Sequence, residues 1–318
     1  MNKASYIFHK EGTTHNPYSS LHFSTSTRLK NTSKMVRIAV IGLVGRSMFF
    51  EVPRFHTGGE TIHAANFHEE WGGKGFNQAI MAARQGAAVS FLGKAGSEAD
   101  ATAIETFCEK EGVEAHIYFS RPATEPTACA AILTDDTGET RVTVARGIEL
   151  DEADVDFGFK EPIAAADILL LNNEVPDEVN LRASEIAAAH GVRIVFNPAP
   201  ARPIPAALAE RVFLFTPNEF EESALGAVAG EVVTTLGARG CRIRSTGEII
   251  PAPTVRAVDT TGAGDTFNGV LAVRLAEGAT LRDACIAANT AAAKSVAVRY
   301  VLPSIPYRIP NQTENRKC

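Results

Sequence analysis

Long hydrophobic runs are missing from this chain of 318 residues, because every apolar stretch is short and is broken by glycine or by charge. None reaches the roughly 20 consecutive apolar residues that a membrane-spanning helix needs. Cysteine is scarce as well: the chain has five, and none has the close spacing that is typical of metal sites. An odd number of widely spaced cysteines indicates reduced thiols and predicts a cytoplasmic protein.

An excess of basic residues is also missing, since 31 lysines and arginines face 37 acidic residues and the net charge is -6. Such a chain has no general attraction to nucleic acid or to an anionic membrane surface, so neither is expected as a partner. Any anionic ligand must therefore be bound by a local arrangement of donors. The 45% hydrophobic content is enough for a large buried core.

The first 34 residues differ in composition from the rest. They are rich in serine, threonine, histidine and lysine, have Glu11 as their only acid and show no helical or strand period. They resemble an organellar transit peptide in composition, but no amphipathic arginine stripe is present. We favour a disordered extension, or an unused upstream start, over a targeting segment that would direct import into an organelle. Residues 311–318 are interpreted as a short tail.

From Met35 onward, buried strand patterns alternate with helical patterns. Continuous apolar runs predict strands at 37–42, 89–93, 167–171, 192–196, 212–215 and 232–236, and helices are predicted at 77–86, 101–112 and 178–190. Apolar strands separated by helices are typical of parallel strands that are covered on both faces. The sequence therefore predicts an α/β fold with a doubly wound, mostly parallel sheet, spanning about residues 35–310.

Two regions, at about 47–69 and 116–146, interrupt this rhythm with alternating polar and apolar residues around turn sequences. Such alternation indicates strands with one wet face. We interpret the two regions together as a small β-sheet lid; the alternative is that they are edge strands of the main sheet. We expect apolar side chains to be exposed on this lid, at Phe49, Phe50, Val52 and Phe55.

A Gly-Ala-Gly turn at 262–264 leads directly into a predicted helix with one apolar face. Small residues at a helix N-terminus allow backbone N–H groups to converge on a phosphoryl group, where the helix dipole adds positive potential. Asp265, at the edge of this site, could accept a proton from an attacking hydroxyl. The alternative is that Asp265 only caps the helix, as aspartate often does.

A second glycine-rich segment, residues 71–79, also precedes a helix. Lys74, Asn77 and Gln78 in this segment supply donors suited to hydroxyl groups. The segment lacks the GxxxxGK spacing of a P-loop, and neither glycine-rich segment has the GxGxxG pattern of a nicotinamide site.

These two segments resemble the two signatures of the ribokinase-like (phosphofructokinase-B-type) carbohydrate kinases, and most closely those of the ribokinase branch. The matching runs are Gly72-Gly73-Lys74-Gly75-x-Asn77-Gln78 and Asp259-Thr260-x-Gly262-Ala263-Gly264-Asp265. Further matches at 197–202, 216–221 and 235–240 lie between them in the family's order. The resemblance extends from about Val36 to about Pro306 and implies a transferase that phosphorylates a sugar hydroxyl with ATP.

The resemblance also implies roles for individual residues. Asp265 is similar to the general base, and the amides of Gly262, Ala263 and Gly264 to the anion hole. The other roles implied are substrate binding for Gly73, Lys74, Asn77 and Glu174; ATP binding for Asn197, Thr235, Gly237 and Gly240; water-mediated Mg²⁺ binding for Asn218 and Glu221; and binding of a monovalent cation such as K⁺ for Asp259. Asn218 and Glu221 also have the residue types of a helix cap. Family members often dimerise through the lid, which implies a homodimer here; alternatively, the apolar lid residues close over the sugar.

The chain departs from the family in three places. Gly45 and Ser47 replace the asparagine and aspartate that usually bind sugar hydroxyls, the segment between Glu221 and Val232 is short by about one helix, and Tyr300-Val301 replaces a Gly-Ala pair. Loss of buried polar partners can change substrate preference strongly. Two alternatives therefore stay open: a nucleoside kinase of the same fold, and a catalytically weak or inactive regulatory protein that binds a sugar or nucleotide.

Overall fold

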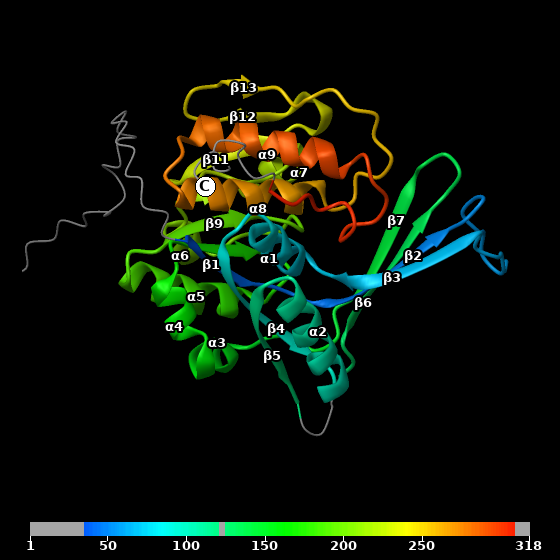
Figure 1. Ribbon diagram of the computed structural model, residues 1–318, viewed down its shortest axis with the longest axis horizontal. Coiled ribbons are helices and arrows are strands. Elements are labelled where there is room, and N and C mark those ends of the chain that lie inside the picture. The colour runs from blue at the N-terminus through cyan, green and yellow to red at the C-terminus, as the bar shows by residue number, and fades with distance from the viewer. Residues whose placement is uncertain (1–34, 121–124, 309–318) are drawn as a thin grey trace, which may run out of the picture. The chain divides into compact units, whose positions relative to one another are not determined.

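A nine-stranded sheet forms the centre of the computed structural model, which describes residues 35–120 and 125–308 (Figure 1). The strand order is β13-β12-β11-β10-β9-β8-β1-β4-β5. From β11 to β5 in this order, neighbouring strands run parallel. Strand β12 runs antiparallel to β11, and β13 runs antiparallel to β12. The strands are β1 (Arg37–Ile41), β4 (Ala88–Ala95), β5 (Val113–Phe119), β8 (Ile168–Asn172), β9 (Arg193–Asn197), β10 (Leu214–Phe215), β11 (Glu231–Thr235), β12 (Cys241–Ile243) and β13 (Ile249–Ile250).

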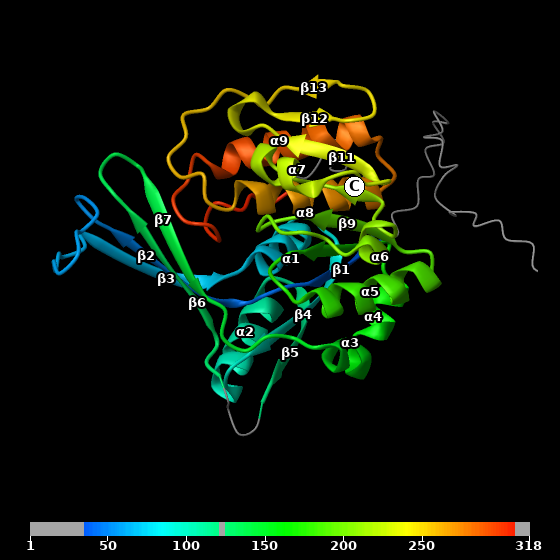
Figure 2. The same ribbon diagram turned by 180° about the vertical axis from the view of Figure 1, so that it is seen from behind.

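Helices cover both faces of this sheet (Figure 2). Ile38 and Val40 of β1 pack into one apolar core with α1, α2, α8 and α9, whereas Ala39 and Ile41 pack into a second core with α3 to α6. Burial on both faces explains why the central strands are apolar without alternation. The helices are α1 (Lys74–Arg84), α2 (Glu98–Lys110), α3 (Glu152–Gly158), α4 (Lys160–Ala165), α5 (Asp177–Ala189), α6 (Ala206–Ala209), α7 (Glu219–Leu225), α8 (Ala263–Ala276) and α9 (Leu281–Ser295), with a 3₁₀ turn at Gly237–Arg239.

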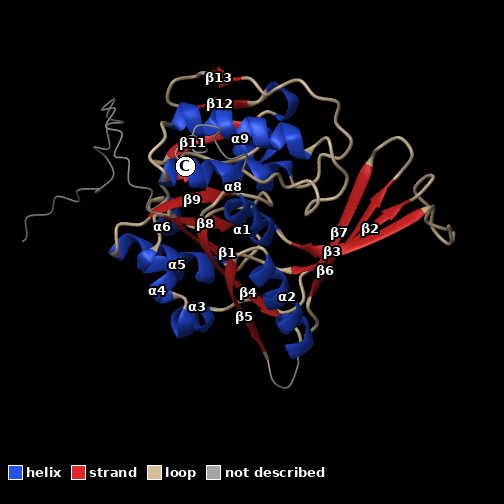
Figure 3. Ribbon diagram, in the orientation of Figure 1, coloured by secondary structure: helices blue, strands red, loops and turns tan. Residues whose placement is uncertain are grey.

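A second sheet of four strands, in the order β3-β2-β6-β7, lies to one side of the main sheet (Figure 3). It consists of β2 (Gly45–Glu51), β3 (Asn66–Gly72), β6 (Ala128–Thr134) and β7 (Thr140–Ala145). The predicted α/β class with a small additional sheet is therefore confirmed. We call this second sheet the lid.

The lid is smaller than the sequence suggested. The expected lid region at 116–146 includes the end of β5, which instead pairs in parallel with β4 at the edge of the main sheet. An edge strand has one solvent-exposed face, so its polar and apolar residues alternate as they do in a lid strand. Phe49 and Val52, expected to be exposed, are only 5% and 4% exposed.

The connection between β10 and β11 contains only α7 as a regular element, in line with the shortened segment that the sequence showed. No helix within residues 35–120 and 125–308 is both long and apolar enough to cross a membrane. The interpretations of residues 1–34 and 311–318 fall on parts of the chain outside the described residues.

Candidate active site

The turn at 262–264 forms the start of α8, as the sequence predicted. Gly262 is the N-cap and has a φ of 76°, a left-handed conformation that favours glycine. The N–H of Ala263 makes only a long contact, 3.3 Å, with the carbonyl oxygen of Thr260. A side chain at Gly264 would meet no atom of the protein within 4 Å, so a ligand can approach this backbone closely. The first-turn N–H groups of a helix of 14 residues are therefore available to an anion.

Asp265 lies in the first turn of α8 and is only 6% exposed. Its Oδ2 accepts a hydrogen bond from Asn77 Nδ2 at 3.0 Å, and its Oδ1 accepts one from Gln78 Nε2 at 3.1 Å. Burial raises the pKa of Asp265, although the Lys74 ammonium and the two amides oppose this shift. The side chain does not cap its own helix, which removes the main alternative to a role as a base.

Close packing of α1 against α8 brings these groups together. At Gly269 an added Cβ would lie 2.7 Å from the Met81 side chain, so only glycine allows the two helices to approach this closely. One turn earlier on each helix, Asn77 and Gln78 face Asp265. The buried oxygens Asn77 Oδ1 and Gln78 Oε1 have no hydrogen-bond partner within the described chain. Buried acceptors are seldom left unpaired, so a ligand hydroxyl would suit this position.

The predicted substrate residues lie at the N-terminus of α1, where Gly73 is the N-cap. The backbone N–H of Lys74 donates to Glu174 Oε2 at 2.6 Å. Glu174 follows β8, and burial raises its pKa to about 7. Burial alone would lower the pKa of Lys74, but the carboxylates of Asp265, Glu174 and Glu221 outweigh it and raise that pKa. The structure therefore brings Lys74, Asn77 and Glu174 to one side of Asp265.

The predicted nucleotide residues follow the ends of β9 and β11. Asn197 Oδ1 accepts a hydrogen bond from Gln78 Nε2 at 3.3 Å, which connects this side to Asp265. Thr235 ends β11 and leads into the turn that contains Gly237 and Gly240. Ligands in open α/β sheets bind outside such carboxyl ends of parallel strands.

Asn218 and Glu221 form a capping box at the start of α7. Asn218 Oδ1 accepts from the Glu221 N–H at 2.8 Å, and Glu221 Oε2 accepts from the Asn218 N–H at 2.9 Å. The capping-box bond uses only Oε2 of the Glu221 carboxylate, and this carboxylate helps to raise the pKa of Lys74. The other carboxylate oxygen fits Mg²⁺ held through water, so the cap and the metal role are compatible. No group of three or more His, Cys, Asp or Glu that could hold a metal ion occurs in the part of the chain that the structure describes.

Asp259 connects two loops. Its Oδ1 accepts from the Thr261 N–H and its Oδ2 from the Tyr300 N–H, both at 2.9 Å. Each oxygen retains a lone pair, so the predicted contact with a monovalent cation stays a prediction.

Three residues at or near the site received no role from the family resemblance, although the sequence indicated Gln78 as a donor suited to hydroxyl groups. Gln78 is fully buried and contacts both Asp265 and Asn197. A buried glutamine among the apolar residues of α1 was a visible signal, because such an amide requires partners. Glu70 and Tyr300 join the lid to the loop at 299–302. The sequence showed Tyr300 only as a departure from the family, and long-range contacts reveal what both residues do.

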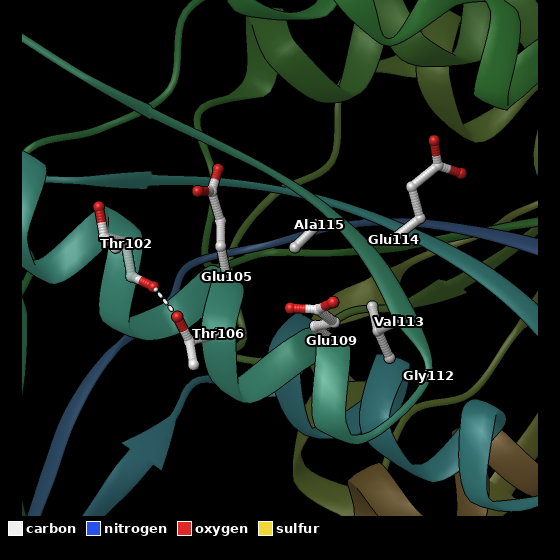
Figure 4. A pocket seen from close by; sticks show the side chains of 8 residues that line it. All are labelled: Thr102, Glu105, Thr106, Glu109, Gly112, Val113, Glu114 and Ala115. Carbon is white, nitrogen blue, oxygen red and sulfur yellow. Dashed lines mark hydrogen bonds between the residues drawn. The ribbon is translucent and has the colours of Figure 1, made fainter.

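A pocket of about 560 Å³ lies elsewhere, between α2 and β5 (Figure 4). Glu105, Glu109 and Glu114 line it, together with residues that include none of the predicted site. Three carboxylates would repel a phosphate group, so this cavity does not fit a nucleotide.

Comparison with known proteins shows the family of the chain. The family model described as pfkB family carbohydrate kinase matches residues 35–307. A ribokinase from Bacillus subtilis is 33% identical over 276 residues, which covers 82% of this chain and 93% of that protein. A ribokinase from Schizosaccharomyces pombe is 31% identical over 307 residues, covering 86% and 95%.

Solved structures give the same result. The structure of Arabidopsis thaliana ribokinase complexed with ribose and ATP superposes with a TM-score of 0.74 at 26% identity, covering 86% of this chain and 96% of that one. A ribokinase from Thermotoga maritima gives a TM-score of 0.73 at 29% identity, covering 86% and 97%. The chain therefore belongs to the pfkB family of carbohydrate kinases.

Proposed function

We propose that Asp265 is the general base, and the amides of residues 262–264 the anion hole, in the transfer of phosphate from ATP to a sugar hydroxyl. Carbohydrate kinase activity with ATP and Mg²⁺ follows from the family and from the ribokinase relatives. The observation that carries the residue assignment is the position of Asp265. It is a buried carboxylate with a raised pKa, one residue beyond Gly264, whose backbone has open space beside it.

The chemistry follows from this arrangement. As the sugar oxygen forms its bond to the γ-phosphorus, the bond from that phosphorus to the bridging oxygen of ATP breaks, and the hydroxyl proton passes to Asp265. The N–H groups at the start of α8 stabilise the charge on the transferring group, because they are already oriented before the reaction. Mg²⁺ held through water at Glu221 would neutralise phosphate charge. Asn77 Oδ1 is an unpaired acceptor that could orient the sugar.

The sugar-binding side of the site favours a substrate whose hydroxyl groups are not bound by β2, the first strand of the lid. Gly45 pairs with Ala128 so closely that an added Cβ would lie 2.2 Å from the Ala128 carbonyl oxygen. An asparagine at this position would therefore displace β6. The remaining acceptors are Glu174, Asn77 and Asp265, so we do not extend the ribose preference of the relatives to this chain. A nucleoside remains the second candidate substrate, because the sequence departs from the family at Gly45 and Ser47.

The test is an ADP-release assay with ATP, Mg²⁺ and a panel of pentoses, hexoses and nucleosides, alongside calorimetric binding of each compound. We expect turnover with at least one sugar. Binding without turnover across the panel would instead support the catalytically inactive regulatory protein, and turnover with nucleosides alone would support the nucleoside kinase.

We also propose that the protein is a homodimer formed through the lid and works in the cytoplasm. Val142 and Val144 on β7 lie two residues apart, so they share one face of the lid, and each is more than half exposed. Exposed apolar side chains at a lid edge suit contact with a second copy of the chain. The four described cysteines are free thiols, which suits a reducing compartment. Light scattering after size exclusion tests the dimer, and a monomer would leave these residues free to close over the sugar.

A further inference from the structure

The loop at 299–302 is attached to the lid by a buried carboxylate. Glu70, on β3, has a side chain that is only 6% exposed. Its Oε1 accepts hydrogen bonds from the N–H groups of Val301 at 2.9 Å and Leu302 at 3.2 Å. Its Oε2 lies 3.1 Å from His68 Nε2. Glu70 is therefore committed to holding this loop and is not free to bind a sugar hydroxyl.

Tyr300 attaches the same loop to the lid a second time. Its ring stacks on His68, with centroids 4.0 Å apart and planes inclined by 22°, and meets Phe49 edge-on at 5.3 Å. Its hydroxyl accepts from Asn66 Nδ2 at 3.1 Å and donates to Glu51 Oε1 at 3.3 Å. Tyr300 has a φ of 65°, which residues other than glycine seldom adopt. Such a conformation persists where surrounding contacts determine it, as the lid contacts do here.

The opposite side of this loop contacts the anion hole. The Tyr300 N–H donates to Asp259 Oδ2, and Asp259 Oδ1 in turn accepts from the Thr261 N–H. The Val301 side chain lies against Gly262, since a Cβ added there would be 2.6 Å from Val301 Cγ1. Movement of the lid would therefore be transmitted to the first residue of the anion hole through two or three direct contacts.

We propose that Glu70 and Tyr300 are positioning residues, which couple the lid to the anion hole through the loop at 299–302. The inference rests on the proposed function, because it assumes that the amides at 262–264 hold the transferring phosphate. The lid strands lie next to the predicted sugar contacts, and the loop at 299–302 lies against Gly262 of the anion hole. The coupling therefore orients the anion hole when the lid is closed. Coupling of this kind is reciprocal, so nucleotide binding should also affect the lid.

The first test compares Glu70→Ala with Glu70→Gln. The alanine variant loses the contacts with the Val301 and Leu302 N–H groups and with His68. We expect kcat to fall about 10- to 100-fold, because a small misplacement of catalytic groups has an effect of this size. The Kd for nucleotide and the Kd for sugar should change little. Glutamine keeps an oxygen that can accept both N–H groups and should restore most of the lost kcat. Glu69→Ala removes the neighbouring carboxylate, which pairs with Arg46, and should have little effect.

The second test needs no turnover. Trp71 is the only tryptophan in the chain and follows Glu70 on β3, so its fluorescence reports on the lid. A non-hydrolysable ATP analogue with Mg²⁺, added without sugar, should change Trp71 emission in the native chain and in Glu70→Gln but not in Glu70→Ala. Tyr300→Ala should weaken the same response.

The outcomes separate the two proposals. A native chain that transfers phosphate but shows no Trp71 response, with Glu70→Ala keeping its kcat, would overturn the coupling alone. Equal losses of kcat and binding in Glu70→Ala and Glu70→Gln would also overturn it, since they would indicate a general role in folding or binding. A native chain that binds no nucleotide would overturn the proposed function, and the coupling with it.

Discussion

Asn77 and Asp265 lie 188 positions apart in the chain, yet the Asn77 amide donates a 3.0 Å hydrogen bond to the Asp265 carboxylate. The contact joins the N-terminal parts of two helices, α1 and α8, each preceded by one of the glycine-rich segments. One of these segments carries the predicted sugar contacts and the other the predicted anion hole. The hydrogen bond therefore places the proposed base between the predicted sugar contacts and the predicted anion hole.

Asp265→Asn should lower kcat by about 10²- to 10⁴-fold and leave ATP affinity nearly unchanged, because the amide cannot take the hydroxyl proton. Steady-state kinetics and calorimetry measure the two effects. Asp136→Asn, in an exposed turn of the lid, is a control that should keep native activity. An unchanged kcat in Asp265→Asn would remove Asp265 from the role of base.

Gln78→Leu should move the acid limb of the pH profile of kcat/KM to higher pH. Burial raises the pKa of Asp265 and the Gln78 amide lowers it, so removal of that amide should raise the pKa further. A base with a higher pKa is protonated at a higher pH, and activity is then lost earlier on acidification. Gln85→Leu, at the other end of α1, should leave the acid limb in place.

Glu174→Gln should remove a pH dependence from the KM for sugar. Burial raises the pKa of Glu174 to about 7, so this carboxyl is ionised mainly above neutrality and is then a stronger hydrogen-bond acceptor. In the native enzyme we expect the KM to fall as the pH rises through about 7, and in the variant to stay flat over this range. Glu178→Gln, nearby on the exposed side of α5, should behave as the native chain. A native KM that does not vary near neutrality would contradict the assignment.

Arg84→Ala should destabilise the fold by about 3–5 kcal/mol, because it leaves the partly buried Glu111 without its partner. The Arg84 guanidinium also donates to the carbonyl oxygens of Leu302 and Ile305 at 2.6 and 3.0 Å. Chemical denaturation measures the loss. The exposed pair of Arg282 with Glu248 provides the comparison, and Arg282→Ala should cost much less stability than Arg84→Ala.

Much of the fold could be predicted because each central strand is a continuous apolar run. Burial on both faces forces this pattern, and the same pattern identifies β1, β8 and β9. The pattern failed at β5, where an edge strand alternates as a lid strand does. Local periodicity reports how many faces of a strand are wet, but it does not report which sheet the strand joins.

The site shows a similar division. Short motifs identified Asp265, Asn77 and the glycine turns, because each motif itself forms the N-terminus of the helix that carries these residues. The lid-to-loop contacts of Glu70 and Tyr300 were not visible, since they span 231 to 249 residues and depend on how the lid lies against a distant loop. No local pattern in a single sequence encodes such a pairing.

The Gln78 side chain, shielded from water and in contact with both Asp265 and Asn197, has a practical consequence for spectroscopy. Its two amide protons should exchange slowly with solvent and give resolved NMR resonances. Because Asp265 belongs to the proposed sugar side and Asn197 to the predicted nucleotide side, we expect isotope labelling of glutamine to provide an internal reporter for the arrival of each ligand.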